Sequence, residues 1–460
     1  MTRQSLISRV AGLGVGLLAV SLLAACTPDG EVPPSTETTA ATSAHLSVVV
    51  YGPTAVTNAY RQVIDAYTKA HQGVSVDVSA YPDEAAAIKA VRDDAASGKE
   101  PDLFLSGVDN LPGLMSDQLI QPVSDLLEDR QIDFGDGYVR GAVEEYSRDL
   151  ALQCMPVDYS PLVVYYNSSV VNLTAAQGDA PKPIEASQKW TMDQFVTAAT
   201  MAASGSRKGI YVAPTVEQAG PFLASAGGSV VDNPDQPTSL TLSSGGSIDG
   251  LTTLLALIRD RQVALPSTTP EATAVRDFEK GKLAMILGYR DLTGELRAHS
   301  EVPFNVLPMP RIGSTQTTGE SSAFCLSHGS ADPTAAADLL ADIVSEPAMT
   351  TLAATGYVMP TNLAVLASDA FWEPTRMPAS SAVFTDQVRR IVETPISDKW
   401  PAVEQYADGR LRAVMKSGST TPDVAILTAR MKLADTVSQQ MFTPPSPSAT
   451  PSATASPSAE

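Results

Sequence analysis

Strand and helix patterns alternate in the first part of the folded chain, and this order constrains the fold more than any other feature. The run from Leu46 to Tyr51 is continuously apolar and ends at a glycine and a proline, which is typical of a buried strand. The pattern continues with a helix carrying Tyr60, Val63, Ile64 and Tyr67, a strand at Val74 to Val78, a helix at Asp83 to Ala96 and a strand at Pro101 to Ser106. This order predicts a parallel sheet with right-handed crossovers, and therefore an α/β fold.

The residues that end the first and third strands are candidate binding residues, because ligands of parallel sheets bind beyond the carboxyl ends of the strands. Most of these side chains can hydrogen-bond to hydroxyl groups. The candidates are Tyr51, Gly52, Ser106, Asp109 and Asn110.

The stretch from Leu152 to Asn167 has the properties of a joint between two lobes. It opens with a cysteine and a proline, continues with Asp158, Tyr159 and Ser160, and closes as an apolar, β-branched run. A polar joint between two apolar strands suits a chain that passes from one lobe to another beside a ligand. We therefore expect an interdomain crossover in a binding protein.

A second alternating region follows this joint. Its strand patterns, separated by helical sequence, lie at Gly209 to Ala213, Leu283 to Leu287 and Ser321 to Ser327. Two of its helices begin at Thr191 and Thr215 with a glutamine three residues later, the spacing of a capping box. Residues 302–310 contain Pro303, Pro308 and Pro310, so we expect a second linker there rather than a central strand.

The first residues predict an exported, lipid-anchored protein. Arg3 and Arg9 form a positive start, and Val10 to Leu23 is apolar but too short to span a bilayer stably. The following Leu23-Ala-Ala-Cys26 resembles a bacterial lipobox; the alternative is an ordinary signal peptide before an incidental cysteine. A lipobox implies that residues 1–25 are removed and that acyl chains such as palmitate on Cys26 hold the protein at the outer face of the cytoplasmic membrane.

Two polar segments flank the predicted folded body, which runs from about His45 to Met441. Residues 26–44 have almost no large apolar side chain and predict a flexible tether. Residues 443–460 repeat proline, serine, alanine and threonine and predict a disordered tail, either glycosylated or simply solvated.

The chain is strongly acidic. After residue 25, 29 basic and 51 acidic residues remain, which gives a formal net charge of −22. Such a charge argues against nucleic acid and against an anionic membrane face as partners.

Two cysteines remain besides Cys26. In an exported chain an even remainder, here Cys154 and Cys325, suggests one disulfide. The alternative is a pair of small buried thiols, and the pattern alone leaves both open.

No motif for catalysis or metal binding is present in the sequence. The four histidines are scattered, and there is no His-Glu-x-x-His, Cys-x-x-Cys, Gly-x-Ser-x-Gly or phosphate-loop motif. We therefore expect no enzyme activity, no metal and no cofactor. Two separated carboxylates can still form a hydrolase pair after folding, so a lipoprotein glycosidase is kept as an alternative.

The order of these features resembles one family along nearly the whole folded body, the extracellular solute-binding lipoproteins of bacterial ABC importers. The likeness is greatest to the carbohydrate-binding branch that includes maltose-binding protein. The segments that carry it are Leu23–Cys26, Pro101–Phe104, Pro156–Asn167, Phe222–Gly228, Phe278–Met285 and Gly356–Pro360.

The resemblance implies a two-lobed, type II periplasmic-binding-protein fold, in which each lobe is a mixed sheet flanked by helices and a hinge joins them. The expected lobes are residues 45–156 with 308–345, and 160–303 with 350–436. It also implies that the strand of Cys325 lies beside that of Cys154, which predicts a Cys154–Cys325 disulfide near the hinge.

Three places that bind sugar in the family correspond here to Asp158-Tyr159-Ser160, Thr215 to Glu217 and Tyr289-Arg290, and Tyr357 is a further candidate. Relatives often have a tryptophan at the third place for stacking on the sugar, where this chain offers Tyr289 or Arg290. Because the chain has only three tryptophans, a long apolar oligosaccharide groove is not expected.

The resemblance thus predicts a monomeric receptor that captures a solute, first of all a mono- or oligosaccharide, and delivers it to the permease of an ABC importer. Carboxylates and amides accept hydrogen bonds from sugar hydroxyls, and aromatic rings cover the apolar sugar face. The alternative solutes are a polyamine, a phosphorylated polyol or a metal chelate, and an anion would depend on Arg290 alone.

Overall fold

The computed structural model describes residues 43–178, 182–184, 189–416 and 418–443. The predicted signal peptide, Cys26 and nearly all of the predicted tether and tail lie outside the described residues. Among those described, no helix has both the length and the apolar character needed to cross a membrane.

The first sheet is mixed, with the order β2-β1-β3-β11-β4, and β7 pairs with β11 beside this path. Its strands are β1 (Ala44–Tyr51), β2 (Val74–Tyr81), β3 (Leu103–Gly107), β4 (Ile120–Gln121), β7 (Cys154–Pro161) and β11 (Gly319–Ser327). The parallel pairing of β1 with β2 and β3 follows the predicted strand–helix alternation, whereas β11 runs antiparallel to β3 and to β7. Strands β5 (Ser147–Arg148) and β6 (Ala151–Leu152) pair antiparallel as a separate small hairpin.

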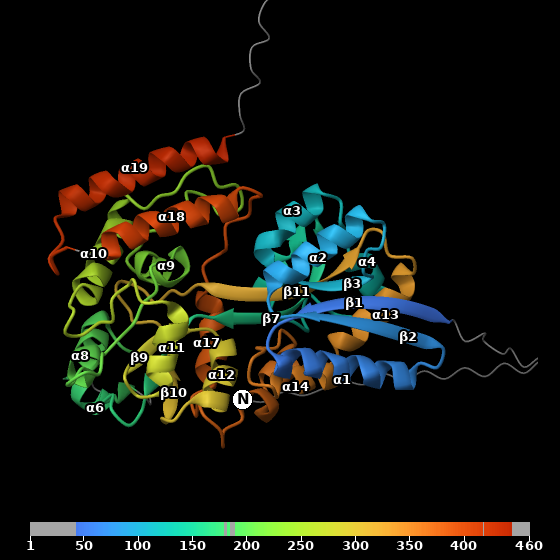
Figure 1. Cartoon of the computed structure of the whole chain (residues 1–460), viewed down its shortest axis with the longest axis horizontal. Coiled ribbons are helices and arrows are strands. Elements are labelled where there is room, and N and C mark those ends of the chain that lie inside the picture. The colour runs from blue at the N-terminus through green and yellow to red at the C-terminus, as the bar shows by residue number, and fades with distance from the viewer. Residues whose placement is uncertain (1–42, 179–181, 185–188, 417, 444–460) are drawn as a thin grey trace, which may run out of the picture. The chain divides into compact units, whose positions relative to one another are not determined.

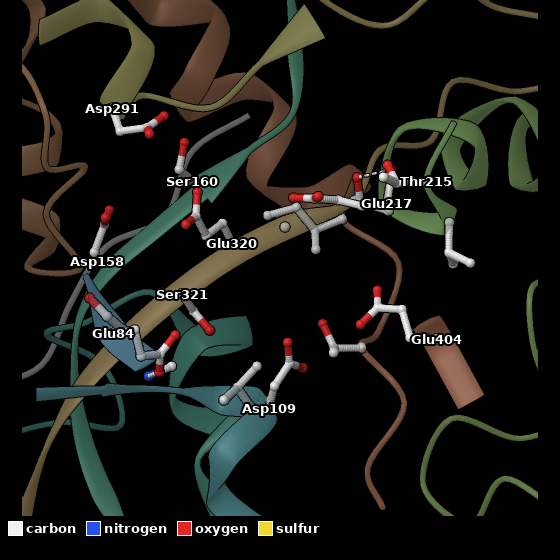
Figure 2. Close-up of a pocket in the computed structure, with 18 of the residues that line it drawn as sticks. Glu84, Asp109, Asp158, Ser160, Thr215, Glu217, Asp291, Glu320, Ser321 and Glu404 are labelled. Atoms are coloured by element: carbon white, nitrogen blue, oxygen red, sulfur yellow. Dashed lines mark hydrogen bonds between the residues drawn. The ribbon is translucent and has the colours of Figure 1, made fainter. Parts of the chain in front are cut away.

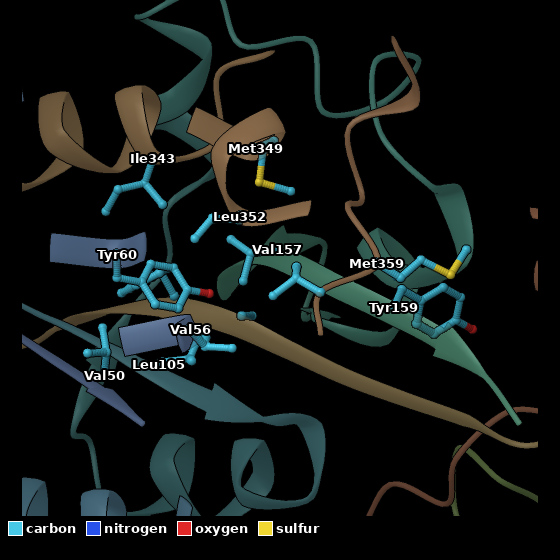
Figure 3. Close-up of a cluster of buried hydrophobic side chains, with 14 of the residues drawn as sticks. Val50, Val56, Tyr60, Leu105, Val157, Tyr159, Ile343, Met349, Leu352 and Met359 are labelled. Atoms are coloured by element: carbon cyan, nitrogen blue, oxygen red, sulfur yellow. The ribbon is translucent and has the colours of Figure 1, made fainter. Parts of the chain in front are cut away.

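Helices α1 (Thr54–Ala70) and α2 (Glu84–Ala96) connect the parallel strands. The helical spacing of Tyr60, Val63 and Ile64 places these side chains on one buried face of α1. The Asp83 carboxylate caps α2 by accepting a hydrogen bond from the Ala86 amide at 2.9 Å. Figure 3 shows Tyr60 in the resulting core, close to side chains from several other elements, among them Val50, Leu105, Val157, Ile343, Met349 and Leu352.

The second sheet has three antiparallel strands in the order β10-β8-β9. They are β8 (Val163–Asn167), β9 (Met285–Gly288) and β10 (Phe304–Leu307). The prediction of a linker at 302–310 was therefore wrong for its centre; the prolines flank β10, which occupies an edge where fewer ladder hydrogen bonds are needed. The strand predicted at Gly209 to Ala213 is reduced to isolated bridges at Ile210 and Tyr211.

The remaining helices surround both sheets, and α18 and α19 lie against α9 and α10 (Figure 1). They are α3 (Leu111–Ser116), α4 (Ser124–Glu128), α5 (Arg140–Glu145), α6 (Leu173–Ala176), α8 (Met192–Ala202), α9 (Val216–Ser225), α10 (Gly245–Ile258), α11 (Glu271–Glu279), α12 (Asp291–His299), α13 (Pro333–Ile343), α14 (Glu346–Ala353), α15 (Leu363–Leu366), α16 (Asp369–Trp372), α17 (Ala382–Gln387), α18 (Trp400–Met415) and α19 (Val424–Phe442). Short 3-10 turns, η1 (Val108–Asn110) and η2 (Val388–Arg390), follow β3 and α17.

The two predicted capping boxes have different outcomes. At α8 the box is complete, since Thr191 accepts from the Gln194 amide while the Gln194 side chain accepts from the Thr191 amide. At α9 only half forms: Thr215 accepts from the Gln218 amide, but the Gln218 carboxamide accepts from the Ala213 amide at 2.7 Å. The second glutamine thereby ties the helix to the segment before it.

The buried side chains form two clusters, the first around the first sheet and one face of the second sheet, the other on the opposite face of the second sheet. The alternation of β8 separates them, because Tyr165 lies in the first cluster and Val164 and Tyr166 lie in the second. Residues 350–436, which were expected in the second lobe, are divided between the two clusters. Met359 bonds to the backbone of β7 and lies in the first cluster, and the chain joins the second cluster at Trp400.

Three chain segments cross between the two sheets and are hydrogen-bonded to one another. Leu162 separates β7 from β8, and its amide donates to the Thr318 carbonyl at 2.9 Å. The Thr317 hydroxyl donates to the Leu162 carbonyl at 2.6 Å, and the Thr317 carbonyl accepts from the Val392 amide at 2.8 Å. The predicted polar joint, Asp158 to Ser160, lies inside β7, so the change of sheet comes at Leu162.

The predicted disulfide is present. Cys154 and Cys325 are paired neighbours on β7 and β11, with their Cα atoms 4.3 Å apart. The bond therefore joins the two adjacent strands that run toward the crossing segments, as predicted.

Candidate functional site

A cavity of about 940 Å³ lies between elements of the two sheets. Its first side is formed by the end of β1, the start of α2, η1 and strands β7 and β11. Its other side is formed by the starts of α9, α12 and α18, and the segment from Ile391 to Pro395 passes along it. Figure 2 shows acidic side chains from these separate elements around one space.

Eight of the sequence-derived candidates line this cavity. Tyr51, Gly52 and Asp109 come from the carboxyl ends of β1 and β3, where ligands of parallel strands are expected. The others are Asp158, Ser160, Thr215, Glu217 and Tyr357. The predicted joint and the predicted start of α9 therefore face the same space.

Three further candidates do not line it. The Ser106 hydroxyl is buried inside β3 and donates to the Gly107 carbonyl. Asn110 donates to the Glu84 carboxylate at 2.8 Å and so positions a side chain that does line the cavity. Tyr159 points to the opposite face of β7, because side chains alternate along a strand, and its hydroxyl donates to Glu145.

Tyr289 and Arg290 are buried behind the cavity wall. The Tyr289 hydroxyl donates to Thr318 at 3.2 Å and lies beside Glu217. The Arg290 side chain has no exposed surface: its guanidinium lies 4.5 Å from the centre of the Phe371 ring and 3.7 Å from Glu373. Only the Arg290 backbone approaches the cavity, donating to the Ser160 hydroxyl at 2.8 Å.

Sequence reasoning missed several residues that line the cavity, namely Glu84, Asp291, Glu320, Trp400 and Glu404. Glu84 follows the carboxyl end of β2, and the rule used for β1 and β3 would have found it. Asp291 follows the predicted Tyr289-Arg290 pair directly. Glu320 lies opposite Ser160 in the β7–β11 register, and no local pattern marks it or the two residues of α18.

Ten carboxylates line the cavity, and we call them the cavity carboxylates: Asp83, Glu84, Asp109, Asp158, Glu217, Asp291, Glu320, Glu393, Glu404 and Asp408. Among the described residues that line it there is no lysine, arginine or histidine. The side chains that line the cavity therefore carry an excess of negative charge.

The protein environment raises the pKa of several of these groups. Burial raises the pKa of Asp158 to about 7, with a further rise from Asp291, against hydrogen bonding from the Met359 amide. Burial and then neighbouring acids raise the pKa of Glu217 to about 7 and that of Glu404 to about 8. For Asp109, burial and the charge of Glu84 raise the pKa to about 6.

The arrangement is suited to binding polar groups. Carboxylates and the hydroxyls of Ser160, Ser321 and Thr215 accept or donate hydrogen bonds, and the rings of Tyr51, Tyr357 and Trp400 add apolar faces. Across the described part of the chain, no three histidine, cysteine, aspartate or glutamate side chains converge closely enough to hold a metal ion. The fold and this cavity define a two-sheet binding protein for a small polar molecule.

The sequence belongs to the bacterial extracellular solute-binding protein family, whose model matches residues 62–379. No curated protein matches the chain.

Solved structures show the same fold at low identity. An ABC substrate-binding protein from Listeria monocytogenes in complex with cycloalternan has a TM-score of 0.73 and 16% identity, covering 87% of this chain and 99% of that chain. The GacH receptor of Streptomyces glaucescens, solved unliganded and with acarbose, has a TM-score of 0.69 and 15% identity, with 86% and 99% covered. A maltose/maltodextrin-binding domain from Bdellovibrio bacteriovorus bound to maltotriose has a TM-score of 0.68 and 15% identity, with 87% and 100% covered.

Proposed function

We propose that this chain is the receptor of an ABC importer, which captures a sugar-type solute in the cavity and delivers it to a permease in the cytoplasmic membrane. The observation that supports this most is the cavity, whose polar lining comes from elements of both sheets and lies beside the three crossing segments. Proteins with this fold have been solved in complex with maltotriose, acarbose and cycloalternan.

In this proposal the crossing segments at Leu162, Thr317 and Val392 act as the hinge. Their mutual hydrogen bonds keep the segments together while the backbone on either side rotates. Closure would bring the start of α9 toward β7 and β11, exclude water and strengthen each hydrogen bond to the solute. The protein binds and releases its solute without changing it chemically.

The anchor is part of the same proposal. A diacylated Cys26 would keep the receptor at the outer face of the membrane, next to its permease, through the tether that follows. The matched test compares membrane fractionation of the wild type with that of Cys26→Ser; equal retention of both would overturn the lipid anchor.

Thermal unfolding of the mature chain with a panel of sugars tests solute capture. A ligand at a hundred times its Kd should stabilise the folded state by about 2.7 kcal/mol, which is a clear rise in Tm. Asp158→Asn should abolish this rise because it changes a carboxylate in the cavity. Asp65→Asn, the same substitution on the exposed face of α1, should leave it intact. If no neutral or charged solute raised Tm, the proposed function would be wrong.

A further inference from the structure

The charge of the cavity distinguishes between classes of solute. The ten cavity carboxylates come from several elements of the fold, and no cationic side chain lines the cavity within the described chain. Unit charges of the same sign repel one another by about 1 kcal/mol at 4 Å even in water, and by more where protein replaces water. A neutral solute leaves this repulsion in place.

Some of the carboxylates are compensated by the protein. Glu84, Glu217 and Asp291 lie in the first turns of α2, α9 and α12, where the helix dipole favours a negative charge. Glu84 also accepts hydrogen bonds from the Gly107 amide and from Asn110. These groups have a structural reason to be charged, and they do not by themselves require a ligand.

Glu320 has no such compensation. It lies on β11 and not in the first turn of a helix, and its side chain makes no hydrogen bond or ion pair with any residue that the structure describes. Its side chain is exposed to the cavity, and Figure 2 shows it between Asp158 and Glu217. The cavity walls partly exclude water from Glu320 and raise its pKa, and Asp291, Glu217, Asp158 and Glu84 raise it further, so the charged groups with the largest effect on it are negative.

Glu404 repeats this arrangement on the other side of the cavity. It comes from α18, and it also has no hydrogen-bond or ion-pair partner in the described chain. Its charged neighbours are Asp109, Asp408 and Glu217. Carboxylates without a partner therefore lie on both walls of the cavity. A positive charge would be stabilised at two separate points, near Glu320 and near Glu404.

A metal ion does not fit this pattern, because a bound cation needs several ligands within one coordination sphere. No such group of three exists among the described residues, and the volume of about 940 Å³ corresponds to an organic molecule. A phosphorylated solute does not fit either, since Arg290 is fully buried against Phe371 and Glu373. The rings of Tyr51, Tyr357 and Trp400 can cover the faces of an organic cation.

We propose that the solute is an organic cation with one or more ammonium groups, held between Glu320 on one wall and Glu404 on the other. This inference rests on the proposed function, since it assigns the chemistry of the molecule captured there. Ammonium groups donate hydrogen bonds to the carboxylates and remove their mutual repulsion at the same time. Amino sugars and linear polyamines share this chemistry.

Isothermal titration calorimetry with matched probes tests the inference. The probes are the β-1,4 trimer of glucosamine, its fully N-acetylated and uncharged form, maltotriose and spermidine, at neutral pH and low salt. We expect a charged probe to bind at least about tenfold more tightly than its neutral counterpart, with affinity falling as salt rises. Tight binding of the glucosamine trimer supports the cation and assigns an amino sugar. Tight binding of spermidine alone also supports the cation, but it assigns a polyamine and overturns the sugar-type solute of the proposed function.

Two variants connect the effect to the cavity. Glu320→Gln should reduce the affinity for the charged probe about tenfold or more and reduce that for maltotriose by a clearly smaller factor, since only the charged probe loses an ion pair. Glu128→Gln, on an exposed position of α4 outside the cavity, should change neither. If the neutral sugars bind and the charged ones bind no better, the cation inference is wrong while solute capture stands. If no probe binds, solute capture fails and the inference fails with it.

Discussion

Two regions of this protein hold carboxylates away from bulk water, and they treat charge in opposite ways. In the Arg290 cluster, formed by Arg290, Arg297, Glu373 and Arg376, one carboxylate contacts three guanidinium groups. In the cavity, Asp158, Glu217, Glu320 and Glu404 have neighbours of their own sign, and no cationic side chain lies among the described lining residues. The first arrangement stabilises the fold. The second keeps a repulsion that a bound solute can remove, and this difference separates the Arg290 cluster from the proposed binding site.

The largest effect is expected from breaking the Arg290 cluster. Glu373→Gln removes the carboxylate and leaves Arg290 and Arg297 with almost no exposed surface and no counter-ion. Breaking a buried pair in this way should cost about 3–5 kcal/mol of unfolding free energy, because an uncompensated charge stays buried. Urea unfolding measures it.

The exposed Glu128→Gln substitution is the control for this prediction and should change stability by no more than about 0.5 kcal/mol. A loss below about 1 kcal/mol for Glu373→Gln would contradict the comparison. It would mean that the ring of Phe371 and the backbone carbonyls alone hold the guanidinium groups.

The second prediction concerns pH and the unliganded cavity. Burial raises the pKa of Asp158 and Glu217 to about 7 and that of Glu404 to about 8, whereas unfolded carboxylates have pKa values near 4. Between pH 5.5 and 8 the native state therefore holds more protons than the unfolded state, and stability falls as pH rises through this window.

After allowing for solvent screening of these partly exposed groups, the loss should be on the order of 2 kcal/mol. Chemical unfolding at several pH values without a solute measures it. A saturating ammonium probe should reverse the slope, since the cation binds the deprotonated carboxylates. Stability that is constant or rises from pH 5.5 to 8 in the unliganded protein would contradict the idea of uncompensated charge.

The same contrast explains what the sequence could and could not predict. Local patterns predicted the strands from Leu46 to Ser106 and the start of α8, because hydrophobic periodicity and caps are set by neighbouring residues. The short strand β10 was missed because the prolines around it suggested a linker, and its edge position is known only from the assembled sheet.

The candidate site divides along the same line. Residues that follow the carboxyl end of a strand, such as Tyr51 and Asp109, were predicted and line the cavity. Tyr159 is next to Asp158 and Ser160 on β7 but points to the opposite face, and Arg290 is buried behind the cavity wall. Which face a side chain occupies depends on the register of the strands, which the local sequence does not fix. Glu320 and Glu404 come together with Asp109 only through long-range folding, so no local signal marks them.

The smallest effect is the most specific test of the comparison. Glu320→Gln keeps the shape of the side chain and removes one charge whose main charged neighbours are other carboxylates. The repulsion removed is about 1 kcal/mol, from a few neighbours at several ångströms in a partly aqueous space. At pH 8 this variant should therefore be more stable than the wild type by about that amount, and at pH 5.5 the difference should vanish as the carboxylates take up protons. Unfolding by urea at both pH values measures the difference.

Glu373→Gln makes the same chemical change in the Arg290 cluster, and its effect on the free energy of unfolding should have the opposite sign. If Glu320→Gln destabilised the unliganded protein at pH 8, then Glu320 would hold the fold together, and its place in the cavity would not indicate a solute.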